Sequence, residues 1–298
     1  MELVKEAALL ERQGRDIIHM GIGEPDFTAP EPVIEAATRA LRSGVTQYTN
    51  ALGLPALREA IAGHYQQVYG ITVDPARIVV TAGASAALLL ACAALVDRDD
   101  EVLMPDPSYP CNRHFVAAAE GKAVLVPSGP AERFQLTAAD VERLWGERTR
   151  GVLLASPSNP TGTSIEPAEL ERIVKAVRAR GGFTIVDEIY QGLSYDAPPV
   201  SALSFGDDVI TVNSFSKYFN MTGWRLGWLV VPPAMVGAFE KLAQNLFICA
   251  SALAQHAALA CFEPHTIGIY ENRRLEFRRR RDFIAPALES LGFSVPVM

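Results

Sequence analysis

The sequence has few cysteines and histidines, and neither residue type is clustered. Its four cysteines, Cys92, Cys111, Cys249 and Cys261, form no CxxC pair, and its five histidines are scattered along the chain. Because zinc sites need closely spaced Cys or His ligands, the spacing predicts no metal site. Cys92, Cys249 and Cys261 lie in apolar stretches, so we expect them to be small buried residues of a protein kept in a reducing compartment.

A secretory signal is also lacking. The first ten residues carry Glu2, Lys5 and Glu6 and no apolar stretch with a cleavage site, so we expect a cytoplasmic protein. The run from Ile78 to Val96 is uncharged and reaches the length of about 18 residues that can cross a bilayer. We interpret it instead as a buried strand, a turn at 83–85 and a buried helix at 86–96, and predict no membrane partner.

The chain has no excess of positive charge. Its 27 lysines and arginines against 34 acidic residues give a formal net charge of −7, which argues against a protein built chiefly to bind nucleic acid. Six arginines do cluster between 273 and 281, but three acidic residues between 271 and 282 alternate with them. A nucleic-acid patch is one interpretation of this cluster. We favour a salt-bridged, solvent-exposed helix face.

What the sequence does contain is the pattern of a large α/β protein. With 298 residues, 49% of them hydrophobic, the chain is long enough for one large α/β unit or two domains. Short apolar strands alternate with helical stretches from about 71 to 231, which predicts a three-layer fold with a mostly parallel central sheet. The clearest strands are expected at 78–81, 101–104, 152–155, 183–186, 209–212 and 226–231.

Apolar periodicity predicts the helices. Apolar residues recur at helical spacing from Leu170 to Val177, which indicates a right-handed crossover helix. A helix from Pro55 to Tyr69 is expected to end at Gly70. Its buried face would comprise Leu57, Ile61 and Val68. Further helices are expected at 1–12, 235–262 and 270–291.

Polar residues gather in the loops after the expected strands. In open α/β sheets ligands bind at the carboxyl ends of the strands, so these loops should share one crevice. Taken singly, most of these residues have plain structural roles as caps, turns or surface charges. Asp187 is the exception, because it closes an apolar strand and needs a cationic partner to stay ionised. The loops are Gly83–Ser85, Asp106–Tyr109, Ser156–Pro160, Asp187–Tyr190 and Ser214–Lys217.

Together these side chains suit a phosphorylated aromatic heterocycle that carries an aldehyde. A helix N-terminus at Gly83–Ser85 and the cation of Arg225 suit a phosphate. Tyr109 can stack on a ring. Lys217, partly desolvated near Arg225, would have a lowered pKa and could form a Schiff base with the aldehyde. Asp187 would keep a ring nitrogen protonated, which turns the ring into an electron sink.

At this point the sequence resembles a known family. Five motifs, in the family's order and over essentially the whole chain, resemble the class I/II aminotransferases of the fold-type-I, aspartate aminotransferase superfamily, which depends on pyridoxal phosphate (PLP). The resemblance implies a large PLP-binding domain at 41–270 and parts of a small domain at 1–40 and 271–298. The motifs are GIGEPDF at 21–27, QYT at 47–49 with GLPALREAI at 53–61, SPSNPTG at 156–162, DEIY at 187–190 and SFSKYFNMTGWRLG at 214–227.

The resemblance also implies residue roles. Lys217 would bear the internal aldimine and carry the proton between the substrate and the cofactor, and Asp187 would pair with the pyridinium. Asn159 and Tyr190 would bond the phenolic oxygen of PLP. The catalytic set would thus be Lys217, Asp187 and Tyr190. The remaining cofactor contacts would be Ala84, Ser85, Ser214, Ser216 and Arg225 at the phosphate, with Tyr109 on the ring.

Two further residues carry implications for substrate and assembly. Gly23 matches the glycine whose backbone borders the substrate, beside Tyr109 and Asn159. Tyr48 matches the tyrosine that reaches the phosphate of a neighbouring subunit, which implies a homodimer with shared sites. The reaction implied is ping-pong: an L-amino acid becomes a 2-oxo acid, and a second 2-oxo acid then takes up the amino group. The choice of substrate side chain stays open.

One expected feature of the family does not match. Members continue into a strand-containing small domain that supplies an arginine for the substrate carboxylate, whereas this sequence has no arginine after Arg281 and stops at Met298. We therefore expect an incomplete small domain. A non-catalytic PLP-binding or interaction protein remains an alternative, as does a PLP-dependent β-lyase that cleaves C–S bonds through the same Lys217. A TIM-barrel aldolase and a nucleotide-binding protein are disfavoured, because eight βα units and a glycine-rich helix start are not evident.

Overall fold

A seven-stranded sheet lies at the centre of the computed structural model, which describes residues 2–297. Its strand order is β1-β7-β6-β5-β4-β2-β3. Strand β7 runs antiparallel to both of its neighbours and the other pairs are parallel, so the predicted mostly parallel sheet is confirmed. The strands are β1 (Ile78–Thr81), β2 (Glu101–Asp106), β3 (Lys122–Pro127), β4 (Thr149–Ala155), β5 (Phe183–Asp187), β6 (Val209–Ser214) and β7 (Gly227–Val230).

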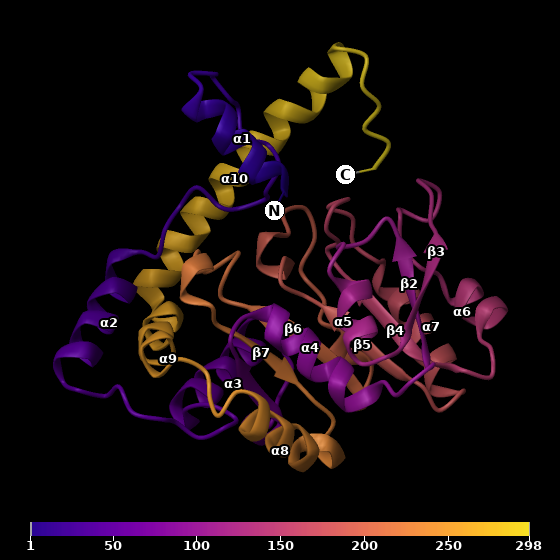
Figure 1. Ribbon diagram of the computed structural model, residues 1–298, viewed down its shortest axis with the longest axis horizontal. Helices are drawn as coiled ribbons and strands as arrows, with labels where there is room; N and C mark the ends of the chain where they lie inside the picture. The colour runs from indigo at the N-terminus through magenta and orange to yellow at the C-terminus, as the bar shows by residue number, and fades with distance from the viewer. Residues whose placement is uncertain (1, 298) are drawn as a thin grey trace.

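Helices cover both faces of this sheet, which gives the predicted three layers (Figure 1). Successive strand residues point to opposite faces. Val79 accordingly packs into one core cluster, and Ile78 and Val80 pack into another. The first face carries α4 (Ala84–Leu95), α5 (Asn112–Ala118) and α8 (Val236–Leu246). The opposite face carries α3 (Pro55–Tyr69), α6 (Ala138–Leu144), α7 (Pro167–Arg178) and α9 (Ala252–Leu259).

The strands differ from the sequence prediction mainly at their ends. β3 was not predicted, because residues 123–125 of this edge strand are only half-buried, which leaves no clear alternation of buried and exposed positions. Several predicted strands extend further than expected, since pairing with neighbours continues past the apolar run. Asp187, for example, still pairs with Ala155 on one side and Val212 on the other. The polar residues at the strand ends are therefore held by the sheet itself.

Helices α2 (Glu31–Arg42), α5 and α6 were not predicted. The predicted helices differ from the structure in four ways. The expected helix at 235–262 is two helices, because Ile248 adopts a left-handed conformation (φ 65°) and Ser251 caps the start of α9. The last helix, α10 (Pro264–Ser290), begins six residues earlier than expected. Helix α4 begins at Ala84, so the predicted turn residues Ala84 and Ser85 form its first turn. In α3, Leu57 and Ile61 are buried as expected but Val68 is 42% exposed, so the predicted face is wrong at its last turn.

The cysteine prediction is partly wrong as well. Cys92 and Cys261 are buried, but Cys249 is half-buried and its thiol accepts a hydrogen bond from the backbone N–H of Thr49 at 3.4 Å. Cys249 lies in the break between α8 and α9, which explains its position outside the core. Among residues 2–297, no cluster of three or more Cys, His, Asp or Glu could hold a metal ion.

Two helices project from the three-layer body. These are α1 (Glu2–Arg12) and the C-terminal half of α10, which both extend above the sheet in the view of Figure 1. Helix α2 (Glu31–Arg42) instead packs against α9. Within the described chain, no helix combines the length and the apolar character needed to cross a bilayer.

The arginine cluster on α10 forms ion pairs, as predicted. Arg280 bonds Asp26 at 2.9 Å, Arg281 bonds Asp196 at 2.5 Å, and Arg274 bonds Glu271 at 2.7 Å. The cluster therefore ties α10 to the chain around Asp26 and Asp196, and the prediction of a salt-bridged helix face is confirmed.

Candidate active site

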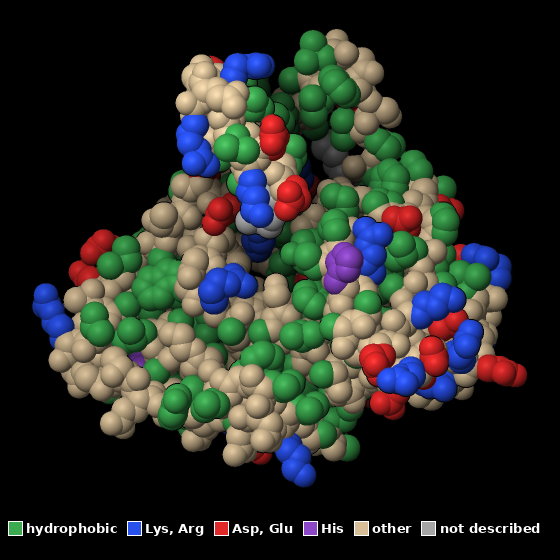
Figure 2. Space-filling view, in the orientation of Figure 1, with side chains coloured by type: hydrophobic (Ala, Val, Ile, Leu, Met, Phe, Trp, Pro, Cys, Tyr) green, Lys and Arg blue, Asp and Glu red, His purple; other side chains and the backbone are tan. Residues whose placement is uncertain are grey.

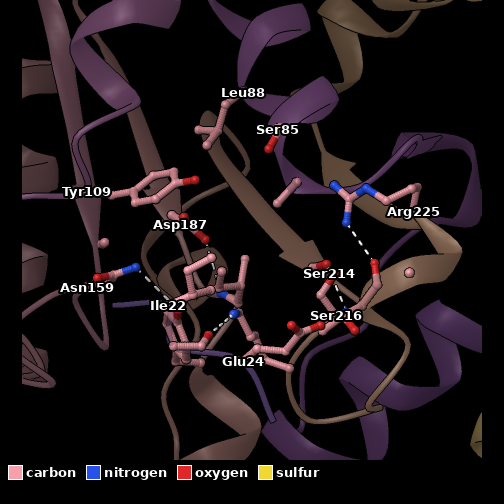
Figure 3. A pocket seen from close by; sticks show the side chains of 18 residues that line it. Ile22, Glu24, Ser85, Leu88, Tyr109, Asn159, Asp187, Ser214, Ser216 and Arg225 are labelled. Atoms are coloured by element: carbon pink, nitrogen blue, oxygen red, sulfur yellow. Dashed lines mark hydrogen bonds between the residues drawn. The ribbon is translucent and has the colours of Figure 1, made fainter. Parts of the chain in front are cut away.

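A pocket of about 580 Å³ lies at the carboxyl ends of β4, β5 and β6, below the projecting helices, where the molecular surface is hollowed (Figures 2 and 3). It brings together at least one polar residue from each loop in which the sequence predicted a site. Eighteen residues line it: Ile22, Gly23, Glu24, Ala84, Ser85, Leu88, Tyr109, Ala155, Asn159, Asp187, Ile189, Tyr190, Ser214, Ser216, Lys217, Thr222, Gly223 and Arg225.

Asp187 lies at one end of the pocket. It is the last residue of β5 and is only 5% exposed. One carboxylate oxygen accepts a hydrogen bond from the backbone N–H of Ile189 at 3.1 Å. Burial raises the pKa of Asp187 to about 7, although the Ile189 N–H and the charge of Lys217 oppose this rise. The hydrogen bond from Ile189 and the charge of Lys217 thus do not fully offset the cost of burying an ionised carboxylate. A cation bound in the pocket would stabilise the ionised form further.

Four side chains lie near the same end. The Asn159 amide donates to the Tyr190 hydroxyl at 3.5 Å, and the Lys217 amine lies 5.6 Å from the centre of the Tyr190 ring. Tyr109 lies on the same side of the pocket as Asn159 and Asp187 (Figure 3). Burial raises the pKa of the Tyr190 phenol. Tyr109 has a pKa raised to about 12, first by a hydrogen bond with Cys111 and then by burial. Both phenols are therefore neutral hydrogen-bonding groups at neutral pH.

Lys217 extends from the loop after β6 into the pocket. Its Nζ donates to the backbone carbonyl of Gly23 at 2.6 Å. Burial is the main cause of its lowered pKa. The Arg225 cation lowers it further, while Glu24 and Asp187 act in the opposite direction. The predicted direction of this pKa change is therefore confirmed. A lysine with a lowered pKa offers more of its neutral, nucleophilic amine at neutral pH.

The other end of the pocket suits an anion. Helix α4 starts there, and its N-terminal residue Gly83 offers no side-chain cap, so the N–H groups of the first turn face a space without a protein acceptor. Ser85, Ser214, Ser216 and Arg225 lie around this point (Figure 3). The Ser216 N–H donates to the Ser214 hydroxyl, which donates to the Leu226 carbonyl. These bonds fix both serines at the end of β6.

Two glycines make this end accessible. A Cβ on Gly83, whose φ is 84°, would lie 2.5 Å from a guanidinium nitrogen of Arg225, so the absence of a side chain lets Arg225 reach the helix start. A Cβ on Gly227 would lie 2.9 Å from the backbone N of Ala84. The helix start, β7 and Arg225 can therefore converge only because these two positions are glycine.

One predicted site residue lies elsewhere. Tyr48 is 80% exposed and does not line the pocket of its own chain. Sequence reasoning also missed several lining residues. Glu24 lies in the GIGEPDF motif, but its residue type alone predicts no role there, although its charge raises the pKa of Lys217. Ile22 and Thr222 also lie in quoted motifs without an assigned role, and Leu88 could not be identified because an apolar residue within a buried helix has no distinctive spacing.

Comparisons with known proteins agree with this site. The family model for aminotransferase class I and II matches residues 15–297. A valine–pyruvate aminotransferase of Mycobacterium tuberculosis is 40% identical over 98% of this chain and 76% of its own length. A (5-formylfuran-3-yl)methyl phosphate transaminase of Methanocaldococcus jannaschii is 34% identical over 99% and 77% of the two chains.

Solved structures share the fold. The crystal structure of an aminotransferase from Mycobacterium tuberculosis superposes with a TM-score of 0.94 at 40% identity, covering 98% of this chain and 76% of that one. The aspartate aminotransferase of Thermus thermophilus with maleate also gives 0.94, at 33% identity, over 98% and 78%. Both relatives thus match nearly all of this chain, which spans about three quarters of their length.

Proposed function

Because this chain belongs to the class I and II aminotransferases, a family that uses pyridoxal phosphate, we propose that it moves the amino group of an L-amino acid to a 2-oxo acid with that cofactor held covalently on Lys217. The observation that carries the proposal is the division of one pocket into an end that suits an anion and an end with a buried carboxylate. Lys217 lies between the two ends.

The donor set fits pyridoxal phosphate. The N–H groups of the α4 start and the Arg225 cation suit a phosphate dianion. Asp187 lacks a full cationic partner, and a protonated ring nitrogen would provide one. When bound, the cofactor supplies an electron sink for the substrate's α-carbon. We propose Ala84, Ser85, Ser214, Ser216 and Arg225 as the phosphate contacts, with Tyr109 against the ring.

Lys217 would perform two tasks. Its lowered pKa favours the neutral amine, which can attack the aldehyde of the cofactor. With a substrate bound, the Lys217 amine would be placed to accept a proton from the substrate's α-carbon and to donate it again during the transfer. Asn159 and the neutral Tyr190 phenol would meanwhile orient the ring through hydrogen bonds at its phenolic oxygen.

The exchange would then run in two halves. In the first half, an L-amino acid would react with water to leave as its 2-oxo acid, and the cofactor would hold the amino group. In the second half, another 2-oxo acid would take up the amino group and release the water. Lys217 returns to its starting state after both halves. Substrates would enter past Gly23, Tyr109 and Asn159, which line the pocket. Tyr48, exposed on its own chain, would complete the phosphate site of a second copy in a cytoplasmic homodimer.

The same scheme suggests a domain division. We propose residues 41–270, which hold the sheet and all the proposed phosphate contacts, as the cofactor-binding domain. Residues 1–40 and 271–298 would belong to the small domain. The substrates named for relatives, which include valine and aspartate, are those of the relatives. Nothing in the comparisons favours the β-lyase or the non-catalytic alternative.

A half-reaction experiment tests the proposed transfer. The protein loaded with pyridoxal phosphate is mixed with single amino acids, without any oxo acid, and its visible absorbance and released products are followed. We expect at least one amino acid to convert the bound cofactor to its aminated form and to release one 2-oxo acid per site, with no ammonia. Release of ammonia with a thiol would instead support the β-lyase. A spectrum unchanged by all twenty amino acids would support the non-catalytic alternative.

A further inference from the structure

Glu188 is a fully buried acidic residue that the proposed chemistry does not use. It follows Asp187 directly, is 0% exposed, and forms no ion pair within the described residues. Its two carboxyl oxygens have separate partners: one accepts from the backbone N–H of Ala202 at 2.6 Å and the other pairs with the Ser201 hydroxyl at 3.0 Å. A buried acid with both oxygens bonded to a distant segment is an anchoring arrangement.

The segment that the Glu188 side chain bonds, Ser201 and Ala202, is part of the core. Ser201 begins the 3₁₀ helix η3 (Ala202–Phe205), and its hydroxyl also accepts a bond from the Leu203 N–H. Ser201 and Ala202 are themselves fully buried, and η3 packs against β6 and α7. The Glu188 side chain therefore joins the end of β5 to a rigid part of the molecule.

Asp187 depends on the geometry of the turn at Glu188. Its carboxylate is held by the N–H of Ile189, the residue after Glu188. The direction of that N–H is set by the backbone angles of Glu188, whose own N–H donates to the Val212 carbonyl at 2.8 Å. Beyond that bond the strand ends. The Gln191 N–H donates to the Glu188 carbonyl at 2.9 Å and closes the turn, and the side-chain bonds of Glu188 tie this turn to Ser201 and Ala202. Asp187 thus faces the pocket, whereas the next residue, Glu188, faces the core.

We propose that Glu188 is a positioning residue that anchors the turn after β5 to Ser201 and Ala202 and thereby fixes the carboxylate of Asp187 at the ring-nitrogen end of the pocket. The inference rests on the proposed function, because it assigns Asp187 the ring nitrogen.

The charge state of Glu188 agrees with an anchoring role. Burial raises its pKa to about 8, and the nearby Asp187 charge raises it as well, while the bonds from Ala202 and Ser201 oppose the rise. The titratable groups that face it from α3 are the phenols of Tyr65 and Tyr69, both neutral because burial raises their pKa values. At neutral pH Glu188 is therefore mostly protonated, so Asp187 can carry the negative charge of this region without a second one beside it.

The test compares two ligands that differ only at the ring nitrogen. Dissociation constants are measured for pyridoxal phosphate and for its carbocyclic analogue, in which CH replaces the ring nitrogen. For the unmodified protein we expect a preference for pyridoxal phosphate, and Asp187→Asn should abolish most of it. Glu188→Leu should lower that preference about 10-fold, the size expected when the charged Asp187 carboxylate loses its hydrogen bond from the Ile189 N–H. Glu188→Gln, which mimics the protonated acid, should restore most of it.

The outcomes separate the two proposals. If Glu188→Leu weakens both ligands equally, its effect is general destabilisation and the inference is overturned. If the unmodified protein binds pyridoxal phosphate without any preference over the analogue, the assigned role of Asp187 fails first. Should Glu188→Leu not fold, Ser201→Ala decides the matter: it removes one of the two anchoring bonds, and we expect a loss of preference of about 3-fold. An unchanged preference in Ser201→Ala would contradict the inference.

Discussion

At the scale of single residues, the pocket contains two groups that the fold holds in unfavourable states. Asp187 is buried without sufficient compensation, and Lys217 is an amine kept partly away from water. Such strain is typical of functional sites, where a bound ligand supplies the missing interaction. The two groups are complementary to one ligand, because a protonated ring nitrogen suits Asp187 and an aldehyde suits Lys217.

Asp187 gives a pH-dependent prediction for the protein without cofactor. Its pKa is about 7 when folded and near its ordinary value of 3.8 when unfolded. Between these values the folded state retains a proton that the unfolded state has lost, so the contribution of Asp187 to stability falls as the pH rises from about 4 to 7. The amide of Asn at this position does not ionise, so its contribution to stability does not change over this pH range. We therefore expect the stability of Asp187→Asn relative to the unmodified protein to improve over this window by a few kcal/mol, at about 1.4 kcal/mol per pKa unit.

Urea denaturation at pH 5 and pH 8 without cofactor measures this difference. Added pyridoxal phosphate should reverse the order of stability at pH 8, because only Asp187 pairs with a charged ring nitrogen. A difference between the two proteins that is the same at both pH values would refute the pKa assignment.

At the scale of secondary structure, the junction of β1, α4 and β7 builds the anion end of the pocket. The sequence identified the turn at Gly83–Ser85 and the polar strand ends, since glycine and serine after an apolar run are strong signals. The sequence could not show that Gly83 leaves space for the Arg225 guanidinium, because that contact depends on how β7 lies against the start of α4. The edge strand β3 and the break at Ile248 escaped prediction for a related reason: tertiary packing, not local periodicity, determines both.

Gly83 gives the prediction at this scale. Gly83→Ala places a Cβ against Arg225 and strains a backbone with φ 84°, so the Arg225 cation should move away from the helix start. We expect affinity for pyridoxal phosphate to fall about 10-fold or more, the order of one lost charge-assisted bond. Affinity for pyridoxal, which lacks the phosphate, should change little.

The comparison needs a matched control. Gly63→Ala lies within α3, where an added Cβ meets nothing within 4 Å, and both affinities should be unchanged in that variant. Equal losses for pyridoxal phosphate and pyridoxal in Gly83→Ala would show a general distortion of the pocket and would count against the phosphate site.

At the scale of the whole molecule, the pocket proposed for the cofactor contains every predicted site residue except Tyr48. The position of Tyr48 on the surface fits a contribution to a second copy, and the sequence implied this role only through the family resemblance. Sequence reasoning at this scale recovered the sheet, the layers and the site loops, because parallel strand ends meet at one edge. It could not specify the substrate side chain, which depends on the shape of the assembled pocket.

Mixing two inactive variants tests the shared site. Tyr48→Ala lacks the proposed contact to the partner's phosphate, and Lys217→Ala lacks the reactive amine. In a mixed dimer, the site with an intact Lys217 would receive Tyr48 from the other subunit. We expect the mixture to regain up to about a quarter of the activity of the unmodified protein, as random pairing of closed dimers allows. If mixed dimers form, as confirmed by sedimentation, but no activity returns, Tyr48 does not contribute to the site of the other subunit.

The central claim is that one lysine holds the cofactor. The chain has five lysines, and Lys217 alone is partly buried while Lys5, Lys122, Lys175 and Lys241 are exposed. Reduction of the loaded protein with borohydride, followed by peptide mass spectrometry, locates the attached cofactor directly. For the unmodified protein, the account predicts one phosphopyridoxyl group per chain, attached to Lys217. For Lys217→Ala, it predicts no label at position 217 and no amino transfer. Labelling spread over the exposed lysines with Lys217 unmodified, or transfer that survives in Lys217→Ala, would contradict it.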